Sequence, residues 1–256
     1  MNILCIGDVV GDAGRGFLAK KLPEYKRLAA VDICVVNGEN SAQGNGITEQ
    51  SAGELFSAGA DAVTTGNHVF RRREVYDYLD RDESVLRPYN YPAGAPGHGV
   101  YIIDRGRYRV GVINLLGTVF SEPLANPFES VLSALKELEG IKHIIVDFHA
   151  EATSEKKAMG FFLDGRVTAL TGTHTHVQTA DETVLENGTA YITDIGMTGP
   201  IRSVLGIKPE LVIEKLRTSM PVRFENSDGA CMMNGCLIHS DDATGRAISV
   251  ERVNII

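Results

Sequence analysis

The stretch NILCIGDVVGDAG, residues 2–14, holds the pattern that decides the fold of this chain. It opens with an apolar run that predicts a buried strand over Asn2 to Ile6. A glycine and an aspartate follow at once, and the amphipathic stretch after them predicts a helix over about Arg15 to Ala29, which Pro23 should kink or delay. A strand, a glycine-rich turn and a helix in this order are typical of a βα unit.

The same alternation continues along the chain and predicts an α/β fold with a largely parallel sheet, in one domain over residues 1–256. Further strands are expected at 32–37, 61–65, 110–115, 143–148, 167–171 and 189–193, and further helices at 48–59, 72–81, 127–139 and 209–218. The stretches CMMNGCLIHS and RAISVERVNI, joined by DDATG, predict a C-terminal hairpin. The stretch 87–99, rich in proline and glycine, predicts a long loop.

Composition excludes several classes of protein. With 33 acidic and 25 basic residues the formal charge is -8, which gives no electrostatic reason to bind a nucleic-acid duplex or an anionic membrane. No apolar run approaches the roughly 18 residues of a membrane-spanning helix, and residues 1–12 show no basic leader, so we expect a cytoplasmic protein. The four cysteines form no CxxC pair, and we expect neither a disulfide nor thiol chemistry.

Residues able to bind metal or transfer protons follow five of the predicted strands. They are Asp8, then Glu39 with Asn40, then Asn67 with His68, then His149, and finally His174 with His176. In open α/β sheets the ligand crevice lies beyond the carboxyl ends of the strands, so we expect these side chains to converge there.

Each member alone has an ordinary explanation. Asp8 would more often cap the next helix, and a single histidine such as His149 is more often hydrogen-bonded in the interior than bound to a metal. The HTH at 174–176 is more specific, since two imidazoles at i and i+2 of an extended segment point the same way. The full set is far more specific than any member.

Three kinds of chemistry compete for this set. A dinucleotide-binding fold would use the first glycine-rich turn and Glu39, but the turn lacks G-x-G-x-x-G and the histidines stay without a role. An amidohydrolase barrel uses an HxH, but directly after its first strand. A binuclear metal hydrolase uses every residue of the set, because two neighbouring cations need a bridging carboxylate and further oxygen or imidazole ligands.

The order GD, GEN, GNH, H and GTHTH resembles the motifs of the calcineurin-like metallophosphoesterases, which are DxH, GDxxD, GNH[DE], H and GHxH. Val10 departs from that pattern where a histidine is usual, Glu39 replaces the usual bridging aspartate, and Val69 replaces an acid. With DFHAEATSEK, GTHTHVQTAD and YITDIGMTGP, these departures resemble the bacterial YmdB-like subfamily of cyclic nucleotide phosphodiesterases.

This resemblance implies a four-layer α/β/β/α sandwich that hydrolyses 2',3'-cyclic nucleotides. It places Asp8, Glu39, Asn40 and His176 on one metal, and Glu39 as the bridge to a second metal held by Asn67, His149 and His174. The ligands are oxygen and imidazole, which suit Fe, Mn or Zn, and the family favours Fe or Mn. The resemblance also makes a homo-oligomer plausible, as does the sheet edge at the C-terminal hairpin.

The expected mechanism is attack by a metal-bridging hydroxide on phosphorus, with His68 as the general acid that protonates the leaving ribose oxygen. Arg202 is a weaker candidate for phosphate contact, equally well explained as a surface cation. Two alternatives stay open: a slow-turnover regulatory protein that binds cyclic nucleotides, and a phosphatase or 3',5'-cyclic nucleotide phosphodiesterase using the same site.

Overall fold

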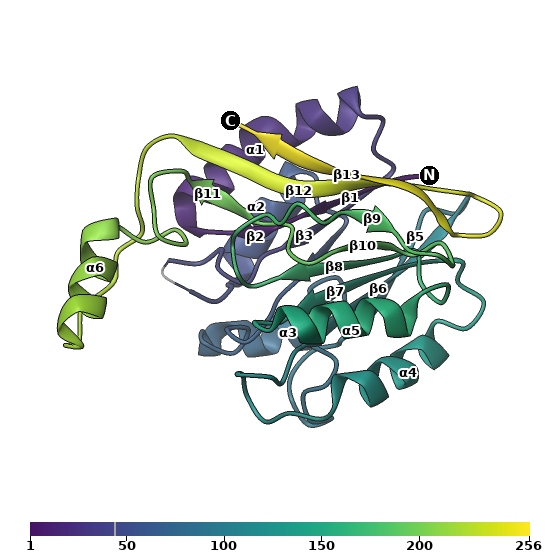
Figure 1. Cartoon of the computed structure of the whole chain (residues 1–256), viewed down its shortest axis with the longest axis horizontal. Coiled ribbons are helices and arrows are strands. Elements are labelled where there is room, and N and C mark those ends of the chain that lie inside the picture. Colours follow the sequence, from purple (N-terminus) through teal and green to yellow (C-terminus); the bar gives the residue numbers. More distant parts are fainter. Residues whose placement is uncertain (44) are drawn as a thin grey trace.

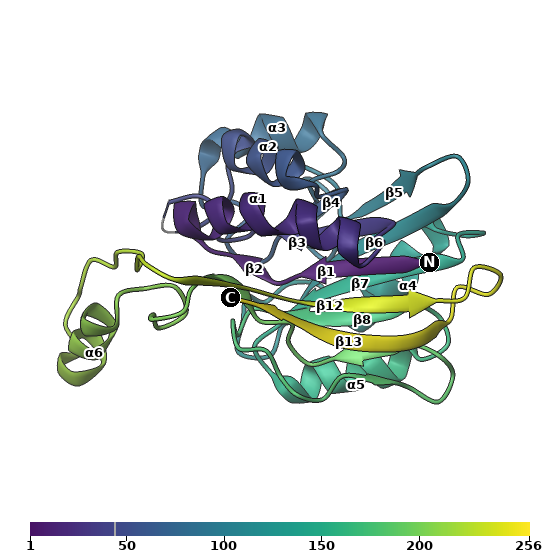
Figure 2. The ribbon, with the colours of Figure 1, turned by 90° about the horizontal axis from the view of Figure 1, so that it is seen from above.

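Two β-sheets pack face to face and helices cover their outer faces, as Figure 1 shows. The structure is a computed structural model that describes residues 1–43 and 45–256. Figure 2 shows α1, α2 and α3 together on one side of the sheets and α5 on the other. Helix α4 packs with α5 against the second sheet, beside it in Figure 1. The layers therefore run α/β/β/α, which confirms the four-layer sandwich.

The first sheet has seven strands in the order β2-β11-β12-β1-β3-β4, with β13 paired to β12. Strands β1, β3 and β4 run parallel. Strand β12 pairs antiparallel with β13 on one side and with β1 and β11, at successive positions, on the other. The strands are β1 (Asn2–Ile6), β2 (Asp8–Val9), β3 (Ile33–Asn37), β4 (Ala62–Thr64), β11 (Met197–Pro200), β12 (Cys231–Ser240) and β13 (Ala247–Ile255).

The second sheet has six strands in the order β5-β6-β7-β8-β10-β9. Strands β6, β7, β8 and β10 are parallel, and β5 and β9 are antiparallel at the two edges. The strands are β5 (Val100–Asp104), β6 (Arg109–Leu116), β7 (His143–His149), β8 (Ala169–Thr173), β9 (Thr183–Val184) and β10 (Ala190–Ile192).

Of the helices in the described residues, five cover the sheets and one stands apart. They are α1 (Gly11–Leu28), α2 (Glu49–Ala58), α3 (Tyr76–Arg81), α4 (Pro127–Glu137), α5 (Thr153–Leu163) and α6 (Pro209–Thr218), with a 3-10 turn at Arg73–Val75 before α3. Both views show α6 projecting from the sandwich, and none of its residues is buried. None of the described helices is long and apolar enough to cross a membrane.

The core has three apolar layers. Ile3, Val35, Val112 and Ile145 belong to the layer between the sheets, and two more layers lie beneath the helices on the outer faces. Because both faces of each sheet are covered, the central strands are apolar on both sides rather than alternating. This burial on both faces explains why the strands could be predicted from short continuous apolar runs in the sequence.

Several predicted elements need correction. The pattern predicted one largely parallel sheet, but the strands divide between two mixed sheets. The first helix begins at Gly11, earlier than predicted, and runs through Pro23 without ending. Strand β8 lies two residues later than predicted. Helix α5 was missed because it buries Glu155 and Lys156 together with apolar residues, which hides its periodicity.

The C-terminal hairpin was predicted correctly, and β12 and β13 pair antiparallel. All four cysteines are free and buried, which agrees with the expectation of no disulfide.

Candidate active site

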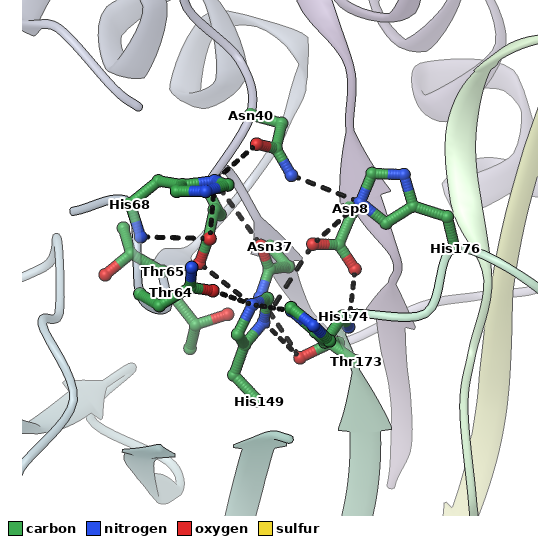
Figure 3. Close-up of polar contacts among 12 residues, drawn as sticks. Asp8, Asn37, Asn40, Thr64, Thr65, His68, His149, Thr173, His174 and His176 are labelled. Atoms are coloured by element: carbon green, nitrogen blue, oxygen red, sulfur yellow. Dashed lines mark hydrogen bonds and ion pairs between the residues drawn. The ribbon is translucent and has the colours of Figure 1, made fainter. Parts of the chain in front are cut away.

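All eight residues of the predicted set lie in one connected cluster, part of which Figure 3 shows. Five come from the first sheet, at β2 or just after β3 and β4, and three come from the ends of β7 and β8 in the second sheet. The convergence therefore takes place across two packed sheets and not along the edge of one. The set is Asp8, Glu39, Asn40, Asn67, His68, His149, His174 and His176.

Asp8 is fully buried at the centre of this cluster. Its Oδ2 accepts a hydrogen bond from the backbone N–H of His174 at 3.2 Å. Its Oδ1 lies 3.6 Å from Nε2 of His176 and has no hydrogen-bond partner. A buried carboxylate oxygen without a partner is costly unless a cation binds it.

Glu39 lies between two histidines. Its Oε1 accepts from the backbone N–H of His68 and lies 3.0 Å from Nδ1 of the same residue. Its Oε2 is 3.1 Å from Nε2 of His149, but the alignment makes no hydrogen bond, so this oxygen also has no partner. The backbone at Gly66 packs so closely here that a Cβ would overlap Glu39 and the ring of His149.

His149 and His174 approach each other through ring nitrogens. Nε2 of His149 lies 3.1 Å from Nδ1 of His174 and 3.2 Å from Oδ1 of Asn67. About 3 Å is also the separation of two nitrogens that bind one cation at roughly 2.1 Å. The three side chains thus present donor atoms to a common region.

Asn40 connects the two sides of the cluster. Its Oδ1 accepts from Nδ1 of His68 at 3.1 Å, and its Nδ2 lies 3.2 Å from Nε2 of His176. An amide nitrogen cannot bind a cation, so ligation by Asn40 requires its amide to turn over.

His149, His174 and His176, the three inner histidines, each have one ring nitrogen that faces the cluster and an outer nitrogen that faces away. Each outer nitrogen also makes a contact. Nε2 of His174 lies 2.9 Å from a carboxylate oxygen of Glu151, and Nδ1 of His176 donates to the carbonyl of Leu205 at 3.1 Å. Nδ1 of His149 lies 2.9 Å from Oγ1 of Thr173. Such contacts orient imidazole rings that bind metals. His174 and His176 also have positive φ angles of 100° and 62°, which direct both rings inward from one short loop.

The charges of the cluster affect one another strongly. Although burial opposes the charge of Asp8, His176 and His149 hold its pKa well below the ordinary value. Burial likewise opposes the charge of Glu39, but His149 and His68 lower its pKa to about 2. Burial disfavours a charged His149, yet Glu39 and Asp8 raise its pKa to about 9. Two buried carboxylates thus require positive charge nearby, from protons on imidazole or from cations.

The donor set suits divalent cations, since it combines two unpartnered carboxylate oxygens with imidazole nitrogens and amide oxygens. Within residues 1–43 and 45–256, no three His, Cys, Asp or Glu side chains are arranged to hold a metal ion as they stand. The two ligand sets implied by the family resemblance each contain three such side chains, so these side chains would have to shift to hold a cation, and the amide of Asn40 would have to turn over.

Two cavities open onto the cluster. One of about 450 Å³ contacts Glu39, Asn40, His68 and His176 and has an apolar wall made by Val10, Leu205, Ile207 and Phe224. The other, of about 420 Å³, contacts Asn67 and His149 and lies beside Phe120. Glu151 and His174 line both. Arg202 is exposed and is not among the described residues that line either cavity.

The sequence pattern did not single out three buried polar residues beneath the cluster, Asn37, Asp147 and Thr173. A signal was present, since Asn37 and Asp147 interrupt apolar strand runs that are otherwise buried on both faces. Glu151 was also missed, because an exposed loop carboxylate has no distinctive pattern.

Comparisons with known proteins show which family this chain is similar to. The family described as YmdB-like protein matches residues 4–253. A 2',3'-cyclic-nucleotide 2'-phosphodiesterase of Bacillus subtilis (strain 168) is 44% identical over 259 residues, which cover 100% of this chain and 97% of that protein.

Two crystal structures share the whole fold. A protein from Thermus thermophilus superimposes with a TM-score of 0.94 at 37% identity, covering 99% of this chain and 98% of that chain. A structure described as a novel phosphatase, from Mycoplasma pneumoniae, gives a TM-score of 0.93 at 33% identity, covering 100% of this chain and 93% of that chain.

Proposed function

This chain belongs to the YmdB-like protein family, and we propose that it is a two-metal phosphodiesterase that hydrolyses 2',3'-cyclic nucleotides. It is a phosphoric diester hydrolase, in keeping with its 44% sequence identity to the Bacillus enzyme over its full length. One observation carries the finer proposal. Asp8 and Glu39 each keep a buried oxygen without a hydrogen bond, in a cluster that also presents four imidazoles.

Two divalent cations would be held by the residues of this cluster. Asp8, Asn40 and His176 would hold the first, Asn67, His149 and His174 would hold the second, and Glu39 would contact both. When bound, such cations supply charge neutralisation at phosphate oxygens and activation of water. We propose Fe or Mn, with Zn also compatible with these ligands.

His68 is proposed as the general acid. Its Nδ1 lies 3.0 Å from Oε1 of Glu39, an acceptor that does not depend on the orientation of the Asn40 amide. This contact holds the ring in place and leaves Nε2 as the nitrogen that can give a proton to the leaving ribose oxygen. The side chain is 27% exposed and lines the larger cavity, so substrate can reach it.

The larger cavity is the proposed place for the nucleoside. Phosphate would lie at the polar end, where His68 and His176 line the cavity, and the base would lie against Val10, Ile207 and Phe224. The flat face of a nucleobase can stack on an aromatic ring, which here would be Phe224. A polymer is not favoured, because the acidic chain lacks the cations that long nucleic acids need along their backbone.

A substrate panel tests this proposal. Protein loaded with Mn²⁺ or Fe²⁺ should hydrolyse 2',3'-cyclic nucleotides with a higher kcat/KM than 3',5'-cyclic nucleotides, linear dinucleotides or phosphate monoesters. A monoester as the best substrate would favour a phosphatase, the description given to the Mycoplasma structure. Tight binding of a cyclic nucleotide without product release over hours would favour the regulatory alternative.

Self-association stays a prediction. Strand β13 pairs with β12 and stands at the side of the first sheet, where an edge can pair with another chain. Analytical ultracentrifugation should show a species larger than one chain.

A further inference from the structure

Proton position at the three inner histidines decides whether they can bind a cation, because the nitrogen that binds must carry a lone pair. Two of them have an outer contact that can only accept. His176 donates from Nδ1 to the carbonyl of Leu205, and His174 faces the carboxylate of Glu151 through Nε2. An accepting partner keeps the proton on the outer nitrogen, so the inner nitrogen of each ring is free.

His149 lacks such a partner. Its Nδ1 contacts Oγ1 of Thr173 at 2.9 Å, and a hydroxyl can either accept or donate. If Thr173 donated, Nδ1 would carry the lone pair and Nε2 the proton. The nitrogen that faces Glu39, Asn67 and His174 would then be unable to bind a cation.

Asp147 determines which way the Thr173 hydroxyl points. Its Oδ1 lies 2.7 Å from Oγ1 of Thr173, and a carboxylate accepts. The hydroxyl hydrogen is therefore turned toward Asp147, which leaves a lone pair of Oγ1 to accept from Nδ1 of His149. Figure 3 shows Thr173 beside His149.

A backbone group sets the direction of the rest of this network. The N–H of Glu39 donates to Oδ1 of Asn37 at 3.0 Å, so the amide group of Asn37 must point its Nδ2 the other way. That Nδ2 donates to Oδ2 of Asp147 at 2.9 Å, and the Thr64 hydroxyl donates to the same oxygen. Asp147 is only 3% exposed, and its two oxygens accept from Asn37, Thr64 and Thr173.

We propose that Asp147 is a positioning residue that acts through Thr173 to keep the proton of His149 on Nδ1 and leave Nε2 free for a cation. The inference rests on the proposed metal site. The network also joins the two sheets. Asn37 and Thr64 belong to β3 and β4 of the first sheet, and they donate to Asp147 of β7 in the second sheet, where Thr173 of β8 also lies.

The isosteric substitution Asp147→Asn should reverse the proton order. The new amide must place its oxygen toward Asn37 and Thr64, which both donate, so its NH₂ group would face Thr173. Thr173 would then accept from position 147 and donate to Nδ1 of His149, which moves the imidazole proton to Nε2.

Two threonines provide a matched comparison. Thr64 and Thr173 both donate to Asp147, but only Thr173 contacts His149. Zn²⁺ affinity, measured by competition with a chromophoric chelator, should fall about 10- to 100-fold in Asp147→Asn and Thr173→Val. Thr64→Val and the conservative Thr173→Ser should stay close to the wild type. Equal losses in Thr64→Val and Thr173→Val would overturn the proposal, since they would mean that the network only supports the fold.

A second measurement needs no metal. In metal-free protein Nε2 of His149 also faces the acceptors Asn67 and Glu39, so the test compares proton shares. In ¹⁵N NMR of histidine-labelled protein at alkaline pH, where the ring is neutral, the share of the proton on Nδ1 of His149 should be larger in the wild type than in Asp147→Asn. An unchanged proton position would contradict the inference. If the wild type bound no Zn²⁺, the proposed metal site would fail, but this spectrum would still decide the role of Asp147.

Discussion

Glu39 contacts both halves of the cluster, with one oxygen toward His68 and the other toward His149. Removal of this side chain should therefore disturb both proposed cations, whereas removal of Asn67 should weaken the second alone. We expect Glu39→Ala to retain less metal than any other single variant of the cluster, by elemental analysis after gel filtration. Two metals per chain are expected in the wild type, and active protein with one or none would refute the binuclear site.

His68 should behave differently from its neighbour Asn67, although both follow β4. His68→Ala should keep both metals and lose roughly 10²- to 10⁴-fold in kcat, the usual contribution of a general acid. A substrate with a nitrophenolate leaving group needs no protonation and should recover much of that loss. Asn67→Ala should show no special recovery. An equal defect on activated and unactivated esters would assign His68 to positioning instead.

At the scale of elements, the turn after β4 must approach the site without a side chain. A Cβ on Gly66 would overlap Oε2 of Glu39 and the ring of His149, so Gly66→Ala should displace two proposed ligands. We expect loss of bound metal and of activity. Gly53→Ala is the matched control, because Gly53 is exposed in α2 with no neighbour within 4 Å of an added Cβ. It should keep activity and stabilise the fold by about 0.5–1 kcal/mol in urea unfolding.

The segments before and after α6 both line the larger cavity. Leu205 and Ile207 precede the helix, and Phe224 follows it. If Phe224 stacks on the base, Phe224→Ala should raise KM for 2',3'-cyclic nucleotides. It should leave KM for the base-free ribose 2',3'-cyclic phosphate unchanged. Phe120→Ala, in the other cavity, is the control. The opposite pattern in steady-state kinetics would place the base beside Phe120.

At the scale of the whole molecule, removal of metal should make stability depend on pH. In the metal-free protein, burial opposes a charged His149, but Glu39 and Asp8 raise its pKa from the ordinary 6.5 to about 9. A raised pKa in the folded state stabilises at low pH, fully below 6.5, and this contribution disappears as pH rises to about 9.

In the presence of chelator, the melting temperature should therefore decrease as the pH rises from 6.5 to about 9. The metal-loaded protein should melt higher and show less of this dependence, because cations replace the protons and bind only the folded state. Differential scanning fluorimetry across the range tests both statements. A flat profile in chelator would contradict the assigned coupling between His149 and the two carboxylates.

Much of this protein follows from local sequence. The apolar runs predicted β1, β3, β6 and β7 almost to the residue, since a strand buried on both faces must be apolar throughout. The short polar motifs after them predicted which side chains gather, because a parallel strand delivers the residues at its carboxyl end to one side of the sheet.

Only the tertiary structure decided how the strands divide and what supports the site. Whether β12 pairs with β1, or whether β7 joins a second sheet, depends on pairings between distant segments that no local period records. The role of Asp147 also depends on distant segments, so in the sequence it was only a polar residue within an apolar strand. It accepts from Asn37, Thr64 and Thr173, which come together only when the two sheets pack. Periodicity reports burial along one segment, whereas the hydrogen bonds that satisfy a buried carboxylate depend on neighbours from other segments.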